Sequence, residues 1–313
     1  MTAAATAAFS ELTDTGLIRA SGADALAFLH AQLTSDIAGL EAFRTQYSGY
    51  CSPKGRLLAT FLVWNVDDGV LLQLPRSLAA DIRARLARYV LRSKVTLADA
   101  TDAYACFGIF GANAPAALAR LPVRAPEHVN EVLASEGILA TRLRGDRFTI
   151  LVPADRAPAV REILATCAQE EPQAAWTRLD IEQGIAVITA ETQDQYVPQM
   201  VNLDLIGAVS YSKGCYPGQE IVARSHYLGR LKQRMYRVRS SSPLATGDSL
   251  FSAAFGADQA SGSVLNAAPE SAAAGYDALA VVQTAAVETA DLHWKSLDGP
   301  LLELKALPYP IPA

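Results

Sequence analysis

The sequence predicts an α+β fold in which two related α+β halves precede a small C-terminal β domain. Strand candidates followed by a helix candidate occur in residues 16–90 and again in residues 103–168, an order typical of α+β units. After residue 236, serine, alanine and glycine become frequent, and helical periodicity gives way to short strand candidates. With 313 residues, half of them apolar, the chain is long enough for two or three domains. We divide it into residues 1–100, 101–232 and 233–313.

The individual elements follow from apolar spacing, which alternates in strands and recurs at helical intervals in helices. The predicted helix at 76–90 places Leu78, Ile82, Leu86 and Tyr89 on one face. The other elements of the two halves are strands at 16–20, 45–50, 57–64, 70–74, 103–110, 129–133, 138–143 and 148–152, and helices at 24–33, 115–121, 157–168 and 176–183. The strands of the C-terminal domain are expected at 235–239, 262–265, 279–282 and 301–305.

Composition and cysteine spacing favour a cytoplasmic protein. The net charge of −5 argues against a surface devoted to nucleic acid or anionic lipid. The first residues lack the cationic start and apolar stretch of a signal peptide, and no apolar run approaches the roughly 20 residues that span a bilayer. The chain has no C-x-x-C pair, and it resembles neither the small nor the secreted proteins that disulfides usually stabilise, so a disulfide framework is not expected. The four cysteines are Cys51, Cys106, Cys167 and Cys215.

The most informative segment is KGCYPGQE at residues 213–220. Pro217 suits the first turn of a helix, because its missing N–H would be unpaired there in any case. Cys215 would then lie just before the helix, where unpaired amides favour a thiolate, and Lys213 would add a nearby cation. The glycines on either side of Cys215 would let a flat ligand or a partner's backbone approach closely. We predict Cys215 to be the one chemically exposed thiol of the chain.

A structural interpretation of Cys215 stands beside the functional one. Free cysteine is usually a small buried apolar residue, whereas the lysine–glycine setting favours a functional thiol. His226 follows shortly after, but nothing in the sequence marks it as a base for Cys215. We therefore expect no catalytic triad.

The pattern K-G-C-Y-x-G-Q-E resembles the signature of the YgfZ family, which includes mitochondrial proteins that help to mature four-iron clusters. The landmarks cover about residues 16–237, and the C-terminal domain is supported by its position and by the closing LPYP. Further stretches that resemble the family are SGADA at 21–25, QLTSD at 32–36, CSPKGR at 51–56 and PQMVNL at 198–203.

The resemblance implies the fold of the glycine-cleavage aminomethyltransferase, a two-part GcvT-like folate-binding region followed by a β barrel. It also implies a site for tetrahydrofolate, whose pterin needs an apolar slot and a carboxylate or amide, and whose acidic tail needs cations. Trp176 lies where the family places a folate-contacting tryptophan, and Glu182 resembles the carboxylate that holds the pterin. Gln219, Glu220 and Arg224 of the signature helix are assigned to the same ligand. Alternatively, Trp176 is a core aromatic and Glu182 a solvated helix residue.

The resemblance fails where the related transferases carry a pair of aspartates. The comparable stretch, residues 56–60, holds no acid, so proton transfer at a folate nitrogen lacks its obvious agent. We assign the essential chemistry to the thiol of Cys215 with Lys213 beside it, and we expect no ordinary turnover. Cys51 could face the same cleft, so transient contact with a cluster stays open, but no resident metal is predicted.

A run without acidic residues extends from residue 221 to residue 247 and is rich in cations. Such a run suits a folate tail, a partner protein or RNA, although a solvated strand face explains most of it equally well. Its cations are Arg224, Arg230, Lys232, Arg234, Arg237 and Arg239.

We thus expect a folate-binding accessory protein that supports iron–sulfur cluster assembly or repair, and thereby tRNA modification by iron–sulfur enzymes. Its expected partners are folate and iron–sulfur client or assembly proteins, without a membrane and without direct nucleic-acid binding. The alternatives are a folate-dependent one-carbon (aminomethyl) transferase and a direct tRNA-binding module that uses residues 224–239.

Overall fold

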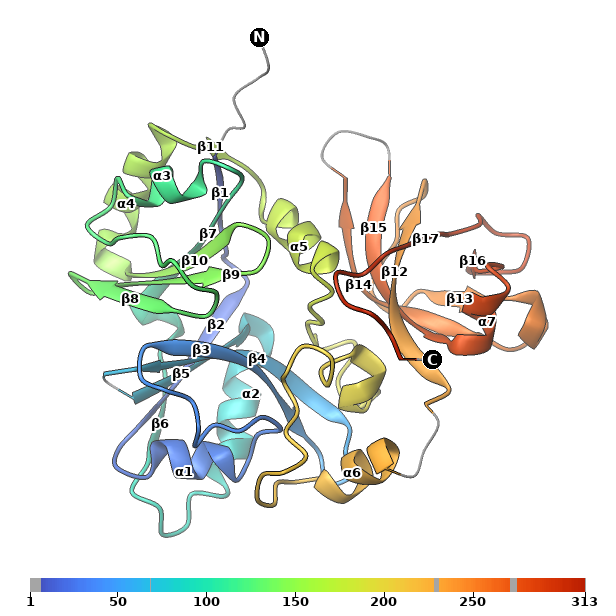
Figure 1. Ribbon diagram of the computed structural model, residues 1–313, viewed down its shortest axis with the longest axis horizontal. Coiled ribbons are helices and arrows are strands. Elements are labelled where there is room, and N and C mark those ends of the chain that lie inside the picture. Colours follow the sequence, from blue (N-terminus) through green and yellow to red (C-terminus); the bar gives the residue numbers. More distant parts are fainter. Residues whose placement is uncertain (1–6, 68, 228–230, 271–274, 313) are drawn as a thin grey trace. The chain divides into compact units, whose positions relative to one another are not determined.

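Residues 7–67, 69–227, 231–270 and 275–312 are described by the computed structural model (Figure 1). They form two units, each assembled from segments that are distant in the sequence. The first unit contains Met1–Leu29, Ile37–Gln46 and Phe61–Trp176, and the second contains His30–Asp36, Tyr47–Thr60 and Thr177–Ala313.

A six-stranded sheet of the first unit is built around a strand from the N-terminus. Phe9 in β1 lies opposite Ile109 in β7, and both side chains are fully buried. Helices α3 and α4 add their apolar residues to the same core, which is why their faces are apolar. The sheet order is β11 (Gln169–Glu170), β1 (Ala8–Glu11), β7 (Tyr104–Phe110), β10 (Arg147–Pro153), β9 (Ile138–Leu143) and β8 (Val132–Ser135). The helices are α3 (Ala114–Leu118), α4 (Ala157–Ala165) and the 3₁₀ turn η2 (Ala154–Arg156).

A five-stranded sheet contains the interior strand β4, whose ten residues are all buried. Helix α2 packs on this sheet through Leu78, Ile82 and Leu86, as predicted. The prediction was wrong for Tyr89, because the helix ends at Ala87 and the ring of Tyr89 is 46% exposed. Strands β3 and β4 each contribute residues to both units. The sheet order is β3 (Arg44–Cys51), β4 (Leu57–Val66), β5 (Gly69–Pro75), β2 (Thr15–Ser21) and β6 (Thr96–Asp99). The helices are α1 (Ala25–His30), α2 (Arg76–Ala87) and η1 (Thr101–Ala103).

The second unit combines a largely irregular segment with a curled antiparallel sheet. Buried residues of the segment, such as Ile188 and Leu203, share one core with Met235 and Leu279 of the sheet. The segment carries the end of α5 (Gln173–Glu182), η3 (Pro198–Val201) and α6 (Gln219–Tyr227). The sheet order is β16 (His293–Trp294), β13 (Ser249–Phe251), β14 (Gly262–Pro269), β15 (Tyr276–Gln283), β12 (Gln233–Ser240) and β17 (Glu303–Lys305), with η4 (Ala253–Phe255) and α7 (Thr284–Glu288).

The α+β fold class and the small C-terminal β domain are confirmed. Every predicted element overlaps an observed one, whereas the short strands β1, β6, β11, β13 and β16 and the helix α7 were not predicted. Because β1 pairs with β7, a strand from before residue 100 belongs to a sheet whose other strands follow that residue. The division at residues 100 and 232 stays a prediction. Within the described ranges, no helix combines the length and the apolar composition needed to cross a membrane.

Candidate functional site

The signature segment forms a loop that leads into α6. Helix α6 begins at Gln219, so Pro217 precedes the helix and does not occupy its first turn as predicted. The reason is Gly218, which has a φ of +78° and turns the chain immediately before the helix. Cys215 lies on the near side of this turn and is exposed. Its thiol is therefore presented by a loop and not by a helix N-terminus.

Lys213 holds this loop in place. Its Nζ donates hydrogen bonds to the backbone carbonyls of His30 and Leu33, the latter at 2.6 Å. The same ammonium group lies 4.7 Å from the ring centre of Tyr216. Burial lowers the pKa of Lys213 to about 8, because the charged amine is partly removed from water. The cation predicted beside Cys215 thus has a structural task in fixing the loop.

Two glycines bring the early landmark at 51–56 into contact with the signature. A Cβ on Gly218 would lie 2.5 Å from the carbonyl oxygen of Ser52 and 2.6 Å from Cα of Gly55. A Cβ on Gly55 would lie 2.8 Å from Cβ of Ile221 in α6. Both positions therefore require glycine, since close-packed backbone cannot yield to a methyl group. The close approach expected from Gly218 is made by the chain itself and not by a ligand.

The loop at 51–56 is itself pinned to the segment before η3. Ser52 Oγ donates to Asp194 Oδ1 at 2.7 Å, and Arg56 Nη1 donates to the carbonyl of Gln195 at 3.0 Å. Lys54 at the tip of this loop is exposed. By contrast, a Cβ on Gly214 would meet nothing within 4 Å. The signature loop is thus fixed on one side and open beside Cys215.

The four cysteines differ in their access to solvent. Cys51 and Cys106 are buried, and burial raises the pKa of the Cys51 thiol and raises that of Cys106 to about 11. Cys167 is exposed together with Cys215, so the prediction of a single exposed thiol was wrong. Cys167 is exposed because it follows the last turn of α4 and lies outside the apolar core. Its thiol donates to the carbonyl of Leu164 at 3.5 Å.

The burial of Cys51 also bears on metal binding. Only 1% of Cys51 is exposed, and its side chain belongs to an apolar core cluster, so it does not share an open cleft with Cys215. Across the part of the chain that the structure describes, no three His, Cys, Asp or Glu side chains are grouped to hold a metal ion. Any cluster contact at Cys215 would therefore need ligands from a second molecule.

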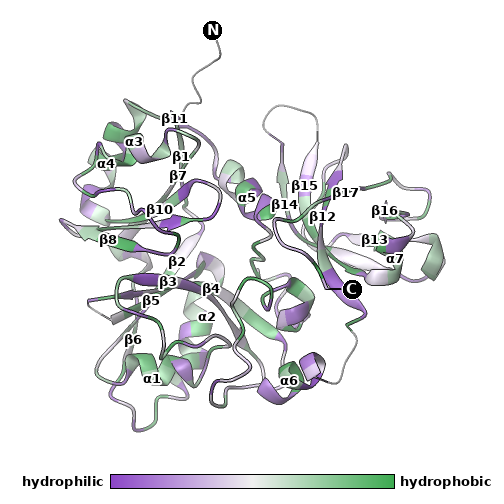
Figure 2. Ribbon diagram, in the orientation of Figure 1, coloured by the Kyte–Doolittle hydropathy of each residue, from purple (hydrophilic) through white to green (hydrophobic). Residues whose placement is uncertain are grey.

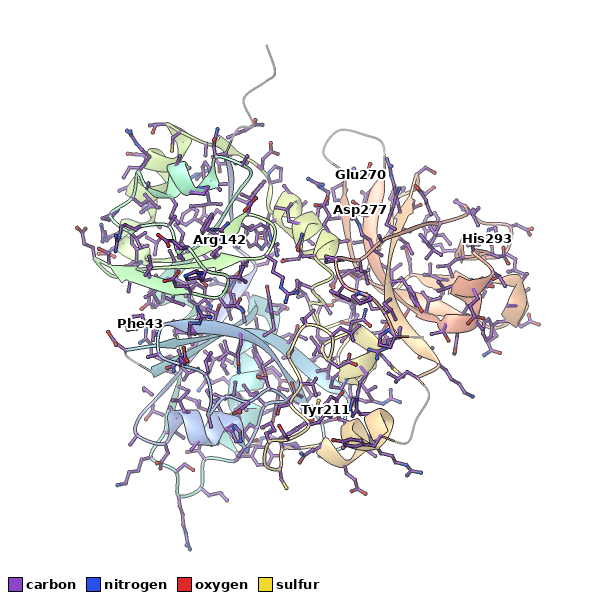
Figure 3. The ribbon with its side chains drawn as sticks, viewed as in Figure 1. Phe43, Arg142, Tyr211, Glu270, Asp277 and His293 are labelled. Carbon is purple, nitrogen blue, oxygen red and sulfur yellow. The ribbon has the colours of Figure 1, made fainter. Side chains whose placement is uncertain are left out.

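The outer end of α6 carries a cluster of rings. Tyr211 stacks on His226 with 3.7 Å between ring centres and 14° between planes. Tyr227 stands edge-on to both, at 6.2 Å from Tyr211 and 4.8 Å from His226. Gln199 supports the stack from the core, because its Nε2 lies 3.2 Å from the Tyr211 hydroxyl and donates to the carbonyl of Val222 at 2.7 Å. Figure 3 labels Tyr211 beside α6.

Trp176 lies on α5 and is buried within the first unit. It is 7% exposed, and its ring covers Gly108 of β7 so closely that a Cβ there would overlap it. The guanidinium of Arg147 lies 4.9 Å from its ring centre. These contacts are those of a core aromatic, the alternative that the sequence left open. A contact between Trp176 and folate stays a prediction.

Glu182 lies at the end of α5 within a cluster of charged side chains of the second unit. Its carboxylate is bonded to Arg178 of the same helix and lies 3.7 Å from Arg237 of β12. Arg237 also pairs with Asp277 of β15 at 3.0 Å, and Asp277 is 2% exposed (Figure 3). Glu182 is thus a half-buried member of an ionic cluster and not a solvated residue.

The residues assigned to folate are not all in direct contact with one another. Gln219 Nε2 lies 3.5 Å from the carbonyl of Lys213, and Glu220 and Arg224 are exposed on α6. Over the described residues, no hydrogen bond or ion pair joins these three side chains to Glu182. We therefore describe the candidate site as two groups of residues, the signature loop with α6 and the ionic cluster around Glu182, and their joint assignment to folate stays a prediction.

The basic run after residue 221 is not a free cationic strip. Arg234 is 7% exposed and makes a two-pronged ion pair with Asp204, at 2.7 and 3.0 Å. Arg239 pairs with Glu270 at 2.7 Å, and Arg237 belongs to the ionic cluster. Arg230 lies outside the described residues. Because the strand arginines are neutralised by acids from elsewhere in the chain, the tRNA-binding surface predicted along residues 224–239 loses its central charges.

Strand β4 contains most of the stretch where the resemblance to the transferases leads one to look for acids. The stretch compared with the aspartate pair of the transferases enters β4, and Leu57, Leu58, Ala59 and Thr60 are all buried there. The first acid after this strand, Asp67, is exposed in a turn. A buried apolar strand offers no carboxylate to a bound folate nitrogen.

Asp277 and Tyr211 were not predicted to be site residues. A signal for Asp277 exists, because it is an acid in the otherwise apolar stretch YDALAVV, and an acid in an inward-facing strand position is rarely left without a partner. The signal for Tyr211 is weaker. Its spacing from His226 does not place the two rings on one helix face, since Tyr211 precedes α6.

Comparisons with known proteins show which family and fold this chain resembles. The family profile of the GCVT N-terminal domain matches residues 2–130. The tRNA-modifying protein YgfZ of Sodalis glossinidius is 33% identical over 243 residues, which are 76% of this chain and 74% of that protein. The protein of the same name from Yersinia pseudotuberculosis is 33% identical over 227 residues, or 72% of this chain and 68% of that protein.

Among solved structures, the glycine cleavage system aminomethyltransferase T from Bartonella henselae matches with a TM-score of 0.80. The match covers 97% of this chain and 86% of that chain at 19% sequence identity. It confirms the predicted GcvT-like fold, and at this identity it carries no conclusion about activity.

Proposed function

Because the chain belongs to the YgfZ family, as its signature segment predicted, we propose that it is a folate-binding accessory protein of the cytoplasm. It supports the assembly or repair of iron–sulfur clusters through Cys215, and thereby the modification of tRNA by iron–sulfur enzymes. The printed name of the relatives, tRNA-modifying protein, supports the final outcome of this role. The steps through folate and iron–sulfur clusters are our proposal.

The observation that carries the proposal is the presentation of Cys215. Its loop is held by the Lys213 hydrogen bonds on one side and by the contact between Gly55 and Gly218 on the other, yet the thiol itself is exposed. A thiol that needs only to fill space would be buried. A rigid loop that exposes its thiol suits a group that must meet a second molecule in a fixed geometry.

The ionic cluster around Glu182 supports a polar ligand such as the pterin of tetrahydrofolate. Three buried atoms of this cluster have no hydrogen-bond partner among the described residues, namely Arg178 Nε, Arg237 Nε and Asp277 Oδ1. Leaving such atoms unpaired costs roughly 1–3 kcal/mol each, so a partner is expected. A pterin edge carries both N–H donors and acceptors. These residues fit it, whereas the buried ring of Trp176 offers little surface for stacking.

We propose an accessory role and not one-carbon transfer, because of the apolar character of β4. A transferase must handle a proton at a folate nitrogen, and the strand that resembles the aspartate-bearing stretch of the transferases is buried and uncharged here. Purified protein should therefore bind tetrahydrofolate without turning over methylene- or formyl-tetrahydrofolate. Measured turnover would contradict this choice.

The role of Cys215 is tested against a matched cysteine. In the native host with the gene deleted, we expect Cys215→Ala to leave iron–sulfur-dependent tRNA modifications low, as measured by mass spectrometry. Cys167→Ala removes the other exposed thiol and should restore these modifications as the wild type does. Thermal unfolding shows whether both variants fold equally. If a folded Cys215→Ala restores modification fully, the proposal fails.

The folate site is tested by calorimetric titration with tetrahydrofolate. Loss of a charged hydrogen-bond partner in Glu182→Gln should weaken binding by about 10- to 100-fold. Glu270→Gln is the control, because Glu270 also pairs with an arginine of β12 but contributes no unpartnered buried atom. Trp176→Phe asks whether the indole contributes while an aromatic ring still covers Gly108. Wild-type protein that binds no tetrahydrofolate would refute the folate half of the proposal.

A further inference from the structure

The ring cluster on α6 has an exposed outer layer. Tyr211 is half-buried and covers one face of His226, while His226 and Tyr227 are exposed. The tyrosine at the edge, Tyr227, is 66% exposed, which is unusual for a ring of this size. Two rings are thus already stacked in parallel, and the exposed ring of His226 ends the stack with Tyr227 standing beside it. Such a corner accepts one more flat ring.

Two exposed cations lie on α6 and on the loop that packs against it. Arg224 is exposed on α6 shortly before His226, and Lys54 is exposed on the loop whose Gly55 touches Ile221 of the same helix. The one acid of α6 is Glu220, at the other end of the helix. Figure 2 shows apolar and strongly polar residues side by side along α6. The surface therefore offers flat rings flanked by positive charge.

We infer that this corner is a stacking site for an unpaired base of an RNA strand. Aromatic side chains combined with nearby cations are how proteins hold single-stranded nucleic acid: the rings stack on the bases, and the cations meet the phosphates. An acidic protein would satisfy the cations, but it would gain nothing from a ready-made parallel stack of rings. The stack is what favours RNA.

This inference places nucleic-acid contact on α6 and not on the strand arginines that the sequence suggested. Arg234, Arg237 and Arg239 are held by acids of the second unit, whereas Arg224 is exposed. It also goes beyond the proposed function, which acts on tRNA only through iron–sulfur enzymes and needs no contact with RNA. Either one can fail without the other.

The test is fluorescence anisotropy with a labelled oligoadenylate RNA of about 12 nucleotides, a length within the usual site size, at about 50 mM salt. We expect the wild type to bind and Tyr227→Ala to weaken binding by about 5- to 100-fold, because a stacked base is lost. Tyr227→Phe keeps the ring and should stay within about twofold of the wild type. Arg224→Gln should reduce the salt dependence by about one phosphate contact.

The matched control is Tyr89→Ala. Tyr89 is a 46% exposed tyrosine that lies among arginines after α2, and within the described residues it has no ring partner. Its loss should change RNA affinity by less than about twofold. The inference is overturned if the wild type does not bind the RNA, if Tyr227→Ala binds as the wild type does, or if Tyr89→Ala or Tyr227→Phe loses as much affinity as Tyr227→Ala.

A competitor without bases separates stacking from charge. Poly-L-glutamate carries the negative charge of the RNA but offers no ring to the His226–Tyr227 corner. We expect it to displace the RNA only at a much higher concentration of charge. If it competes equally well at equal charge, the surface recognises an acidic polymer or protein and not a base, and the inference is wrong.

Discussion

The contact between the signature and the early landmark can be broken by one methyl group. Gly218→Ala places a Cβ 2.5 Å from the carbonyl oxygen of Ser52 and 2.6 Å from Cα of Gly55. Because these neighbours are backbone atoms, no rotamer change can relieve the clash, and one of the two loops must move. Gly218 also has a φ of +78°, a region that residues other than glycine rarely adopt.

The loss of stability in Gly218→Ala is estimated from the backbone strain and the steric clash. A left-handed backbone costs a non-glycine residue about 1–2 kcal/mol, and overpacking of a tight contact costs about 1–3 kcal/mol. Replacing glycine also restricts the unfolded chain, which returns about 0.4–1 kcal/mol. The expected loss in the free energy of unfolding for Gly218→Ala is therefore roughly 1–5 kcal/mol.

Two other glycines of the same segment separate these terms. Gly207 has a φ of +80° with nothing within 4 Å of an added Cβ, so Gly207→Ala should show the backbone term alone. Gly214 has neither a positive φ nor a close neighbour, so Gly214→Ala should be neutral or slightly stabilising. The free energy of unfolding should be highest for Gly214→Ala, lower for Gly207→Ala and lowest for Gly218→Ala.

The assay is urea unfolding combined with labelling of the thiols by a colorimetric disulfide reagent. In a Cys167→Ala background the fast-reacting thiol is that of Cys215, and movement of its loop in Gly218→Ala should change its labelling rate. Gly214→Ala serves as the control for proximity to the thiol. If Gly218→Ala is as stable as Gly214→Ala and labels at the same rate, the two landmarks do not hold each other.

Two further predictions concern charged groups of the C-terminal sheet. Arg234→Met leaves the largely buried carboxylate of Asp204 unpaired and should lower the free energy of unfolding by about 3–5 kcal/mol. Arg239→Met breaks the more exposed pair with Glu270 and should lower it by no more than about 1 kcal/mol. Equal losses in the two variants would contradict this prediction. The carbonyl of Gly299, followed by the carboxylate of Asp291, raises the pKa of His293 in the folded protein. The stability that protonated His293 contributes is therefore complete below its unfolded pKa of about 6.5, and it is lost as the pH rises through the raised pKa of the folded state. The unfolding midpoint should fall over that pH range in the wild type and fall less in His293→Gln.

Local patterns in the sequence predicted most of the fold. The face of α2 was predicted correctly as far as Leu86, because the spacing of apolar residues in an amphipathic helix reflects which side is buried. Strand β1 was missed, because its four residues are stabilised by β7, almost a hundred residues away, and by β11. A strand that short carries no periodicity of its own, and its partners are set by the tertiary fold.

The candidate site was predictable in its position but not in its contacts. The signature predicted where Cys215 lies in the chain, and no pattern could show that Gly218 rests on Gly55, a residue far earlier in the sequence. For the same reason the basic run looked free, since the acids that neutralise Arg234 and Arg239 lie outside it. Charge in a sequence window is not charge on a surface.

These contacts narrow what Cys215 can do by itself. Lys213 already donates to two backbone carbonyls, Cys51 is buried, and the ring of His226 is stacked on Tyr211. Thiol chemistry needs a base, a second sulfur or a metal ion, and each of these three side chains is either buried or engaged in another contact. This arrangement supports our proposal that Cys215 reacts with a group from another molecule.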